Sequence, residues 1–146
     1  DLNWVQLMNA YSCTECGRCT SECPANQTGK KLSPRKIMMD TRDRLEKVSL
    51  NISKNKGEFV DDGDRLLDNY ISKEELWACT SCNACVEVCP INIDPLSIIM
   101  DMRQYLIMEE SSAHPDLNNM MNNIENNGAP WPYNQLDREL WAQETQ

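Results

Sequence analysis

At four places along the chain, a polar residue stands between two apolar residues that are five positions apart. This is the pattern of a hydrophobic staple, in which apolar residues on either side of a helix start pack together. The polar residues are Asn3, Ser33, Ser72 and Asp94, and the apolar pairs are Leu2 and Leu7, Leu32 and Ile37, Ile71 and Leu76, and Ile93 and Ile98. Gln6 and Glu75 complete capping boxes at two of the places, and a proline suited to the first helical position follows at the other two. The pattern predicts four helix starts and an all-α fold.

The two helices that begin with proline resemble each other. Residues 37–42 read Ile-Met-Met-Asp-Thr-Arg, and residues 98–103 read Ile-Ile-Met-Asp-Met-Arg. A cysteine-rich segment and a further helix precede each of them, so the chain reads as two copies of a helix–cysteine loop–helix unit. From the last cysteine to the shared Ile there are fourteen residues in copy one and nine in copy two. We therefore expect an insertion in copy one over residues 27–31, with Gly29 as a turn.

The remaining segments are more polar. Residues 49–64, between the copies, contain the helix breakers Asn55 and Gly57 and predict a loop. Residues 61–64 read Asp-Asp-Gly-Asp, but they lack the alternating ligands of a calcium loop and indicate a solvated turn. In the tail we expect a short helix over residues 117–124, a break over 126–132 and a last turn over 136–141. These patterns predict a helical domain over residues 1–110 and a C-terminal extension or linker over residues 111–146.

Eight cysteines form two groups with the same spacing and a proline after each group. In bacterial ferredoxins, the first three thiolates of a C-x2-C-x2-C-x3-C-P run hold one [4Fe–4S] cluster and the fourth holds the other. The fourth cysteine leaves the loop on an extended path, because a following proline disfavours helix. The sequence thus predicts two [4Fe–4S] clusters with crossed ligands: Cys13, Cys16, Cys19 and Cys89 for cluster 1, and Cys79, Cys82, Cys85 and Cys23 for cluster 2.

Two other uses of cysteine compete with iron–sulfur binding. Structural zinc sites use two cysteine pairs separated by a longer linker, and a zinc-binding structural or interaction domain remains the alternative. Disulfides require an oxidising compartment. The first residues do not read as a signal peptide, and no apolar stretch is long enough to span a bilayer. We therefore expect a cytoplasmic protein with free thiols and no membrane span in this chain.

The charge of the chain bears on its partners. The net charge of −9 offers no basic surface for phosphates, which argues against nucleic acid as a partner. Residues 1–42 nevertheless carry six basic and four acidic side chains, and their cations surround the first cysteine group. We expect cluster 1 to be reduced first for that reason, with Arg18 and Lys36 among the cations that raise its potential.

Other residue types point to packing or to the surface. His114 is expected at the surface, and Met38, Met39, Met100 and Met102 are expected to pack around the clusters. The sequence contains no catalytic triad, phosphate loop or carboxylate pair that can be argued. We therefore expect no catalysis by this chain alone.

Two stretches carry a family resemblance. Residues 75–82, Glu-Leu-Trp-Ala-Cys-Thr-Ser-Cys, and the paired cysteine runs resemble the α-helical ferredoxin domain. That domain occurs in the small iron–sulfur subunit of heterodisulfide reductase, in the iron–sulfur subunit of anaerobic glycerol-3-phosphate dehydrogenase and in membrane-bound iron–sulfur oxidoreductases. Residues 123–131, with Arg138 and Trp141, are similar to the segment that joins such a domain to a cysteine-rich CCG domain. Ala129 and Pro132 depart from that pattern, in which Asn and Gly are usual.

The resemblance implies a fold and a role. The fold would be an α-helical ferredoxin over residues 1–110, with two pseudo-symmetric halves around two clusters. The chain would be the electron-transfer part of a longer, heterodisulfide-reductase-like oxidoreductase. Its redox partners would be CCG-type domains, a flavoprotein, or a membrane cytochrome or quinone module. Through such a parent protein or partner, it would sit at the inner face of the membrane.

Overall fold

The structure is a computed structural model that describes residues 2–143, apart from the side chain of Gln135. No residue in that range lies in a β-strand, and every regular element is helical, which confirms the all-α prediction. The chain divides into two compact units, Asp1–Tyr105 and Leu106–Gln146. Within residues 2–143, no helix combines the length and the apolar character needed to span a membrane.

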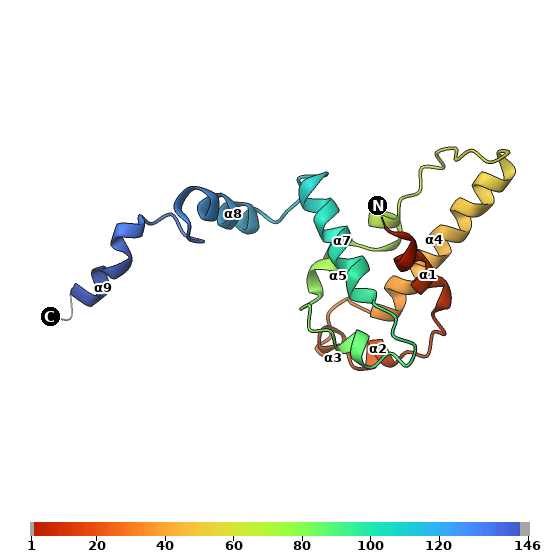
Figure 1. The fold of residues 1–146 in the computed structure, drawn as a ribbon, viewed down its shortest axis with the longest axis horizontal. Coiled ribbons are helices and arrows are strands. Elements are labelled where there is room, and N and C mark those ends of the chain that lie inside the picture. The colour runs from red at the N-terminus through yellow and green to blue at the C-terminus, as the bar shows by residue number, and fades with distance from the viewer. Residues whose placement is uncertain (1, 144–146) are drawn as a thin grey trace. The chain divides into compact units, whose positions relative to one another are not determined.

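The first unit contains the two copies predicted from the sequence (Figure 1). The elements of copy one are α1 (Trp4–Ser12), α2 (Arg18–Ser21), α3 (Pro24–Gln27) and α4 (Pro34–Lys54). Those of copy two are α5 (Lys73–Ala78), α6 (Ala84–Glu87) and α7 (Pro95–Met108). The segment η1 (Leu66–Tyr70) precedes α5, and Leu67 and Asp68 have non-helical backbone angles within it. We therefore describe η1 as a turn, closed by the hydrogen bond from Ile71 N to Leu66 O at 3.0 Å.

All four predicted helix starts are confirmed. The Asn3 side chain accepts a hydrogen bond from Gln6 N, and the Gln6 side chain accepts one from Asn3 N, which closes the capping box of α1. Ser72 and Glu75 close the second box at α5. The side chains of Ser33 and Asp94 accept from the backbone N–H groups of Lys36 and Ser97 at the starts of α4 and α7.

The core of the first unit is built mainly from the staple residues. Three of the four staple pairs are almost fully buried: Leu32 with Ile37, Ile71 with Leu76, and Ile93 with Ile98. Fully burying such a side chain contributes about 1.5–3 kcal/mol. The residues that start the helices therefore also hold the helices together near the cysteine loops.

The loop between the copies differs from the prediction in two respects. Helix α4 continues through residues 49–54 and ends only at Asn55, because the Asn51 side chain exchanges hydrogen bonds of 2.8 and 3.0 Å with the backbone of Val60. The turn at residues 61–64 is tethered rather than merely solvated. Arg44 donates two hydrogen bonds to Asp62, at 2.6 and 2.8 Å, and lowers the pKa of that carboxyl to about 2.

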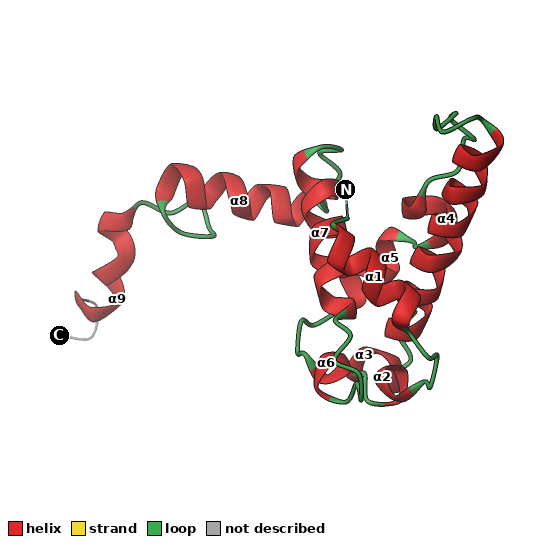
Figure 2. Ribbon diagram, turned by 45° about the vertical axis from the view of Figure 1, so that its right-hand side comes forward, coloured by secondary structure: helices red, strands yellow, loops and turns green. Residues whose placement is uncertain are grey.

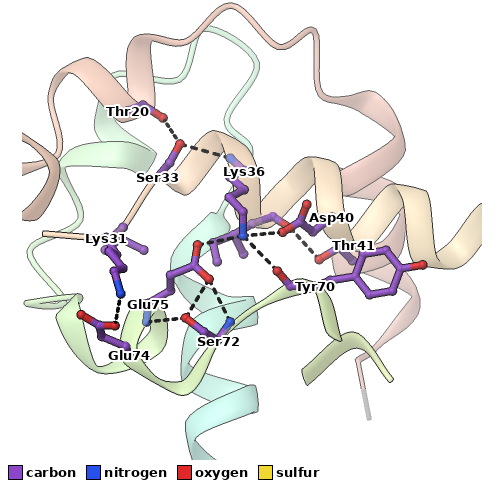
Figure 3. A network of polar contacts seen from close by, with 12 residues as sticks. Thr20, Lys31, Ser33, Lys36, Asp40, Thr41, Tyr70, Ser72, Glu74 and Glu75 are labelled. Carbon is purple, nitrogen blue, oxygen red and sulfur yellow. Dashed lines mark hydrogen bonds and ion pairs between the residues drawn. The ribbon is translucent and has the colours of Figure 1, made fainter. Parts of the chain in front are cut away.

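The two copies are joined by polar contacts that cross between them. In α4, Lys36 Nζ lies 2.8 Å from Glu75 of α5 and 2.9 Å from Asp40 (Figure 3). Asp101, which corresponds to Asp40 in the duplicated helix, accepts a 2.6 Å hydrogen bond from Gln6 of α1. The helix before each cysteine group is thus tied to the helix after the other group.

The second unit contains α8 (Pro115–Asn127), η2 (Gln135–Glu139) and α9 (Leu140–Gln143). The helix expected over residues 117–124 is confirmed and is longer at both ends. His114 is exposed, as expected, and its Nδ1 also accepts a hydrogen bond from Asp116 N as the cap of α8. Gly128 ends α8 in a left-handed conformation, with a φ of 65°. None of the residues of α8 is buried within this structure.

Candidate functional site

The two cysteine groups lie together at one end of the first unit. We call residues 13–23 loop 1 and residues 79–89 loop 2. Helix α2 of loop 1 packs against helix α6 of loop 2, and both views show these helices at the same end of the unit (Figures 1 and 2). The fold therefore brings together two cysteine groups that are far apart in the sequence.

The two loops have the same backbone conformation. Glu15 and Ser81, at equivalent positions, have φ values of 57° and 56°, and Gly17 and Asn83 have values of 80° and 61°. The carbonyl oxygens of Gly17 and Asn83 each accept two hydrogen bonds, which start the short helices α2 and α6. A left-handed conformation costs a residue other than glycine about 1–2 kcal/mol. Such strain, repeated in both copies, is typical of a functional constraint on the backbone.

The two exposed cysteines follow the same symmetry, whereas the two buried ones occupy non-equivalent positions. All eight lie within residues 2–143 and are free thiols. Cys16 and Cys82, at equivalent positions, are the two exposed ones, while Cys23 and Cys85 are buried. The exposed thiols lie at the surface of each loop, and the buried pair comes from different copies.

One cavity gathers cysteines from both loops. It is lined by Cys13, Cys16 and Cys19 of loop 1 and by Cys85 and Cys89 of loop 2. Met38 and Ile93, both buried, are among its apolar lining residues. The fourth cysteine of loop 2 thus faces the same space as the first three cysteines of loop 1. Five thiols thus line one space with an apolar wall, and four of them, the three of loop 1 and Cys89, match the four-thiolate donor set of an iron–sulfur cluster.

Cys85 lies where thiols from both copies approach each other. Burial, together with the charges of Cys79, Cys19 and Cys23, raises the pKa of Cys85 to about 12. Because the thiolate is the nucleophilic form, such a thiol is a poor free nucleophile. A coordinated metal deprotonates a thiol outright. The environment of Cys85 therefore suits a metal ligand better than a catalytic cysteine.

Backbone N–H groups point at two of the sulfur atoms. Ser81 N donates to Cys79 Sγ at 3.4 Å, and Ile93 N donates to Cys89 Sγ at 3.3 Å. Hydrogen bonds to ligand sulfurs stabilise the thiolate and raise the potential of a bound cluster.

Within residues 2–143, no three His, Cys, Asp or Glu side chains are placed to hold a single metal ion.

The charges around the two loops differ from the sequence-based expectation. Lys31 pairs with Glu74 at 2.7 Å and Lys36 with Glu75 at 2.8 Å, so two of the cations assigned to cluster 1 are bound to carboxylates of copy two. Arg18 is exposed to solvent, and the exposed Arg35 lines the cavity. The prediction that cluster 1 is reduced first stays a prediction, but Lys36 does not act as a free cation beside that cluster. The sequence alone could not reveal that these lysines pair with Glu74 and Glu75, because the partners are far apart along the chain.

Sequence reasoning also missed two residues next to the loops. Arg42 contacts Glu15 in loop 1, and Arg103 contacts the backbone of Cys79 in loop 2. They are the last matching letters of the duplicated helix, at residues 37–42 and 98–103. The fact that both copies have an arginine at this position was the feature of the sequence that could have identified them.

The expectation that methionines pack around the clusters holds for Met38, which is buried against the cavity, but Met100 is 46% exposed.

A comparison with protein families matches residues 12–93 to the family described as "4Fe-4S dicluster domain". The chain belongs to this family. The 4Fe–4S dicluster domain carries two clusters, so the prediction of two [4Fe–4S] clusters is confirmed, and so is the role of an electron-transfer module. The matched region begins at Ser12 and ends at Ile93, and it contains all eight cysteines. The zinc alternative therefore loses its support.

Relatives of this dicluster domain include long oxidoreductases and small subunits. The chain is 32% identical to the probable iron-sulfur-binding oxidoreductase FadF of Bacillus subtilis and 30% identical to the EtfAB:quinone oxidoreductase of Syntrophomonas wolfei. Each match covers 99% of this chain and 24% or 23% of the relative. The chain is also 27% identical to a subunit of the H(2)/formate:CoB-CoM heterodisulfide,ferredoxin reductase of Methanococcus maripaludis, over 75% of this chain and 47% of that relative. The chain thus spans about a quarter of the oxidoreductases that it matches.

Proposed function

We propose that this dicluster domain relays electrons inside a larger iron–sulfur oxidoreductase, from a flavoprotein to a quinone-reducing or disulfide-reducing module. When bound, each [4Fe–4S] cluster supplies a site that takes up and gives back one electron. The chain's own residues hold the clusters, set their potentials and keep them close together. The chain alone turns over no substrate.

The observation that carries the proposal is the contact between the two cysteine loops. Helices α2 and α6 pack directly on each other, and thiols of both loops line one cavity. Two clusters held by such loops would be close enough to exchange electrons without a further cofactor between them. A relay requires this arrangement, whereas a zinc-bound structural domain has no use for it.

The ligand assignment belongs to the same proposal. Cys13, Cys16, Cys19 and Cys89 would hold cluster 1, and Cys79, Cys82, Cys85 and Cys23 would hold cluster 2. Support for cluster 1 comes from the cavity that Cys89 shares with the first three cysteines of loop 1, although Cys85 also lines it. For cluster 2, Cys79 and Cys23 both lie close enough to Cys85 to raise its pKa, and Cys19 of loop 1 does so as well.

The partner classes rest on the relatives. One of them is named an EtfAB:quinone oxidoreductase and another is named as part of a heterodisulfide,ferredoxin reductase. The first name gives EtfAB and a quinone as the redox partners of that relative, and the second gives a heterodisulfide and ferredoxin. A flavoprotein donor and a quinone- or disulfide-reducing acceptor, such as a CCG-type domain or a membrane cytochrome module, are therefore the partners we propose. We also propose that the domain works in the cytoplasm, at the inner face of the membrane, through such a partner or parent protein.

The test is a reductive titration of the anaerobically purified chain. The proposal predicts a brown protein with iron and sulfide for two clusters and uptake of two electrons. It also predicts no turnover beyond those electrons when reduced dye and a quinone or disulfide are supplied. A colourless protein with stoichiometric zinc would contradict the proposal, and so would sustained turnover by the chain alone.

A further inference from the structure

Arg103 holds the backbone at the point where α5 enters loop 2. Its Nη2 donates to the carbonyl oxygens of Leu76 and Cys79, both at 2.6 Å, and its Nε donates to the Leu76 oxygen at 3.0 Å. Its guanidinium stacks over the ring of Trp77, 5.0 Å from the ring centre. A rigid planar fork of donors is what distinguishes arginine from lysine in such a site.

Arg103 also contacts a residue that donates a hydrogen bond to a ligand sulfur. Its Nη1 lies 3.5 Å from the hydroxyl of Ser81, and Ser81 N donates to Cys79 Sγ. Within residues 2–143, no carboxylate is paired with Arg103: its polar partners are two carbonyl oxygens, a hydroxyl and the Met100 sulfur. Its positive charge is therefore not neutralised, and it lies partly buried beside loop 2.

The equivalent residue of copy one, Arg42, has a different electrostatic environment. Arg42 pairs with Glu15 at 2.5 Å, and Glu15 occupies the position that corresponds to Ser81. Glu15 also lines the cavity that holds the loop 1 thiols. The two arginines have the same place in the duplicated fold, but the carboxylate cancels the charge of Arg42. Near cluster 1 the charge of Arg42 is offset by Glu15, with Asp43 a second carboxylate 3.8 Å away, whereas Arg103 near cluster 2 has no paired carboxylate in the described part of the chain.

We propose that Arg103 is a positioning residue that raises the reduction potential of cluster 2, through its unpaired charge and through its hold on Cys79 and Ser81. This rests on the proposed function only in that Cys79 ligates a cluster. Adding an electron makes a thiolate-held cluster more negative, so a nearby cation stabilises the reduced form. The exposed cations near loop 1 are screened by water and salt, whereas Arg103 is partly shielded from both.

The test measures the potential of each cluster by an EPR-monitored titration. Signals are assigned with Cys16→Ser and Cys82→Ser, which alter the exposed ligands of cluster 1 and cluster 2 respectively. For Arg103→Gln we expect the reduction equilibrium constant of cluster 2 to fall at least tenfold, which is about 59 mV for one electron. Cluster 1 and the iron content should not change. Arg103→Lys keeps the charge but loses the fork of donors, so it should restore only the part of the loss that the charge causes.

A reciprocal exchange provides the matched control. Ser81→Glu places a carboxylate where copy one has it and should lower the potential of cluster 2. Glu15→Ser removes that carboxylate from copy one and should raise the potential of cluster 1. The native φ values of the two positions are 56° and 57°, so the backbone strain is matched.

The outcomes separate this inference from the proposed function. If wild-type protein lacks clusters, the proposed function fails. If both clusters are present and neither Arg103→Gln nor Ser81→Glu lowers the potential of cluster 2, only the role of Arg103 is overturned. If Arg103→Gln loses iron, Ser81→Glu decides, because it leaves the arginine and its backbone contacts in place: a lower potential supports the inference, and an unchanged one overturns it.

Discussion

Loop 1 and loop 2 have nearly the same backbone and different surroundings. Both turn through two left-handed residues, both open a one-turn helix, and both expose their second cysteine. Around them, however, loop 1 faces the neutral pair of Arg42 and Glu15, whereas loop 2 faces the unpaired Arg103. Duplication has thus kept the geometry that presents thiols to iron, and the side chains that surround the thiols have diverged. The residues that determine the geometry of the cysteine loops are therefore different from those that we expect to set the cluster potentials.

Removing the iron should have the largest effect, because it acts on both loops at once. The crossed ligands would tie loop 1 to loop 2, so metal binding and folding of the first unit would be coupled. We expect a chelator to unfold both copies together. Hydrogen exchange would show this as simultaneous loss of protection in α4 and α7. Protection that persists in the helices of one copy would contradict the coupling.

The contacts between the copies offer the next test, through two carboxylates that share Lys36. Burial alone would raise the pKa of Glu75, but hydrogen bonds from Lys36 and Ser72 hold it below its usual value. Its stabilising effect is therefore complete at pH 7 and is lost only as the pH falls through that lowered pKa. Glu75→Gln should destabilise the protein by about 1–3 kcal/mol at pH 7.

Asp40→Asn is the control for this change. Burial raises the pKa of Asp40, and within residues 2–143 its buried Oδ2 has no well-aligned hydrogen-bond donor, although Lys36 Nζ is 2.9 Å away. Its charged form is disfavoured in the fold, so Asp40→Asn should leave the melting temperature unchanged or raise it. Equal destabilisation by Glu75→Gln and Asp40→Asn would show that the network is not organised around Glu75.

The left-handed positions test the shared backbone directly. A Cβ at Gly17 would meet no atom within 4 Å, so Gly17→Ala costs only conformational strain. We expect a loss of about 1 kcal/mol. Asn83→Gly, at the equivalent position of loop 2, should be close to neutral, because it removes strain and adds chain entropy. Melting temperatures of the holo-protein would measure both changes, and a destabilising Asn83→Gly would show that the Asn83 side chain has a role of its own.

The smallest effect is expected from the exposed cation in loop 1. Arg18 lies in solvent, where salt screens its field. Arg18→Glu should lower the potential of cluster 1 by less than Arg103→Gln lowers that of cluster 2, and the shift should shrink as ionic strength rises. A large, salt-independent shift would restore the sequence-based view that free cations near loop 1 set the order of reduction.

Much of this architecture was predictable because local chemistry determines it. Caps at Asn3 and Ser72 and prolines after Ser33 and Asp94 specify helix starts within a few residues, and cysteine spacing specifies a ligand loop. What escaped prediction depends on contacts across the fold. Asn51 extends α4 by binding the backbone of Val60, and Lys36 finds Glu75 in the other copy. Residue spacing holds no information about such pairs until the two copies are placed together.

The exchange of the fourth cysteine between the loops is the central claim, and paired cysteine variants test it most directly. Iron analysis and EPR of Cys23→Ala should show cluster 2 damaged and cluster 1 intact. The same measurement on Cys89→Ala should show the reverse. If Cys23→Ala damages only the cluster held by Cys13, Cys16 and Cys19, the ligands are not crossed and the account is wrong.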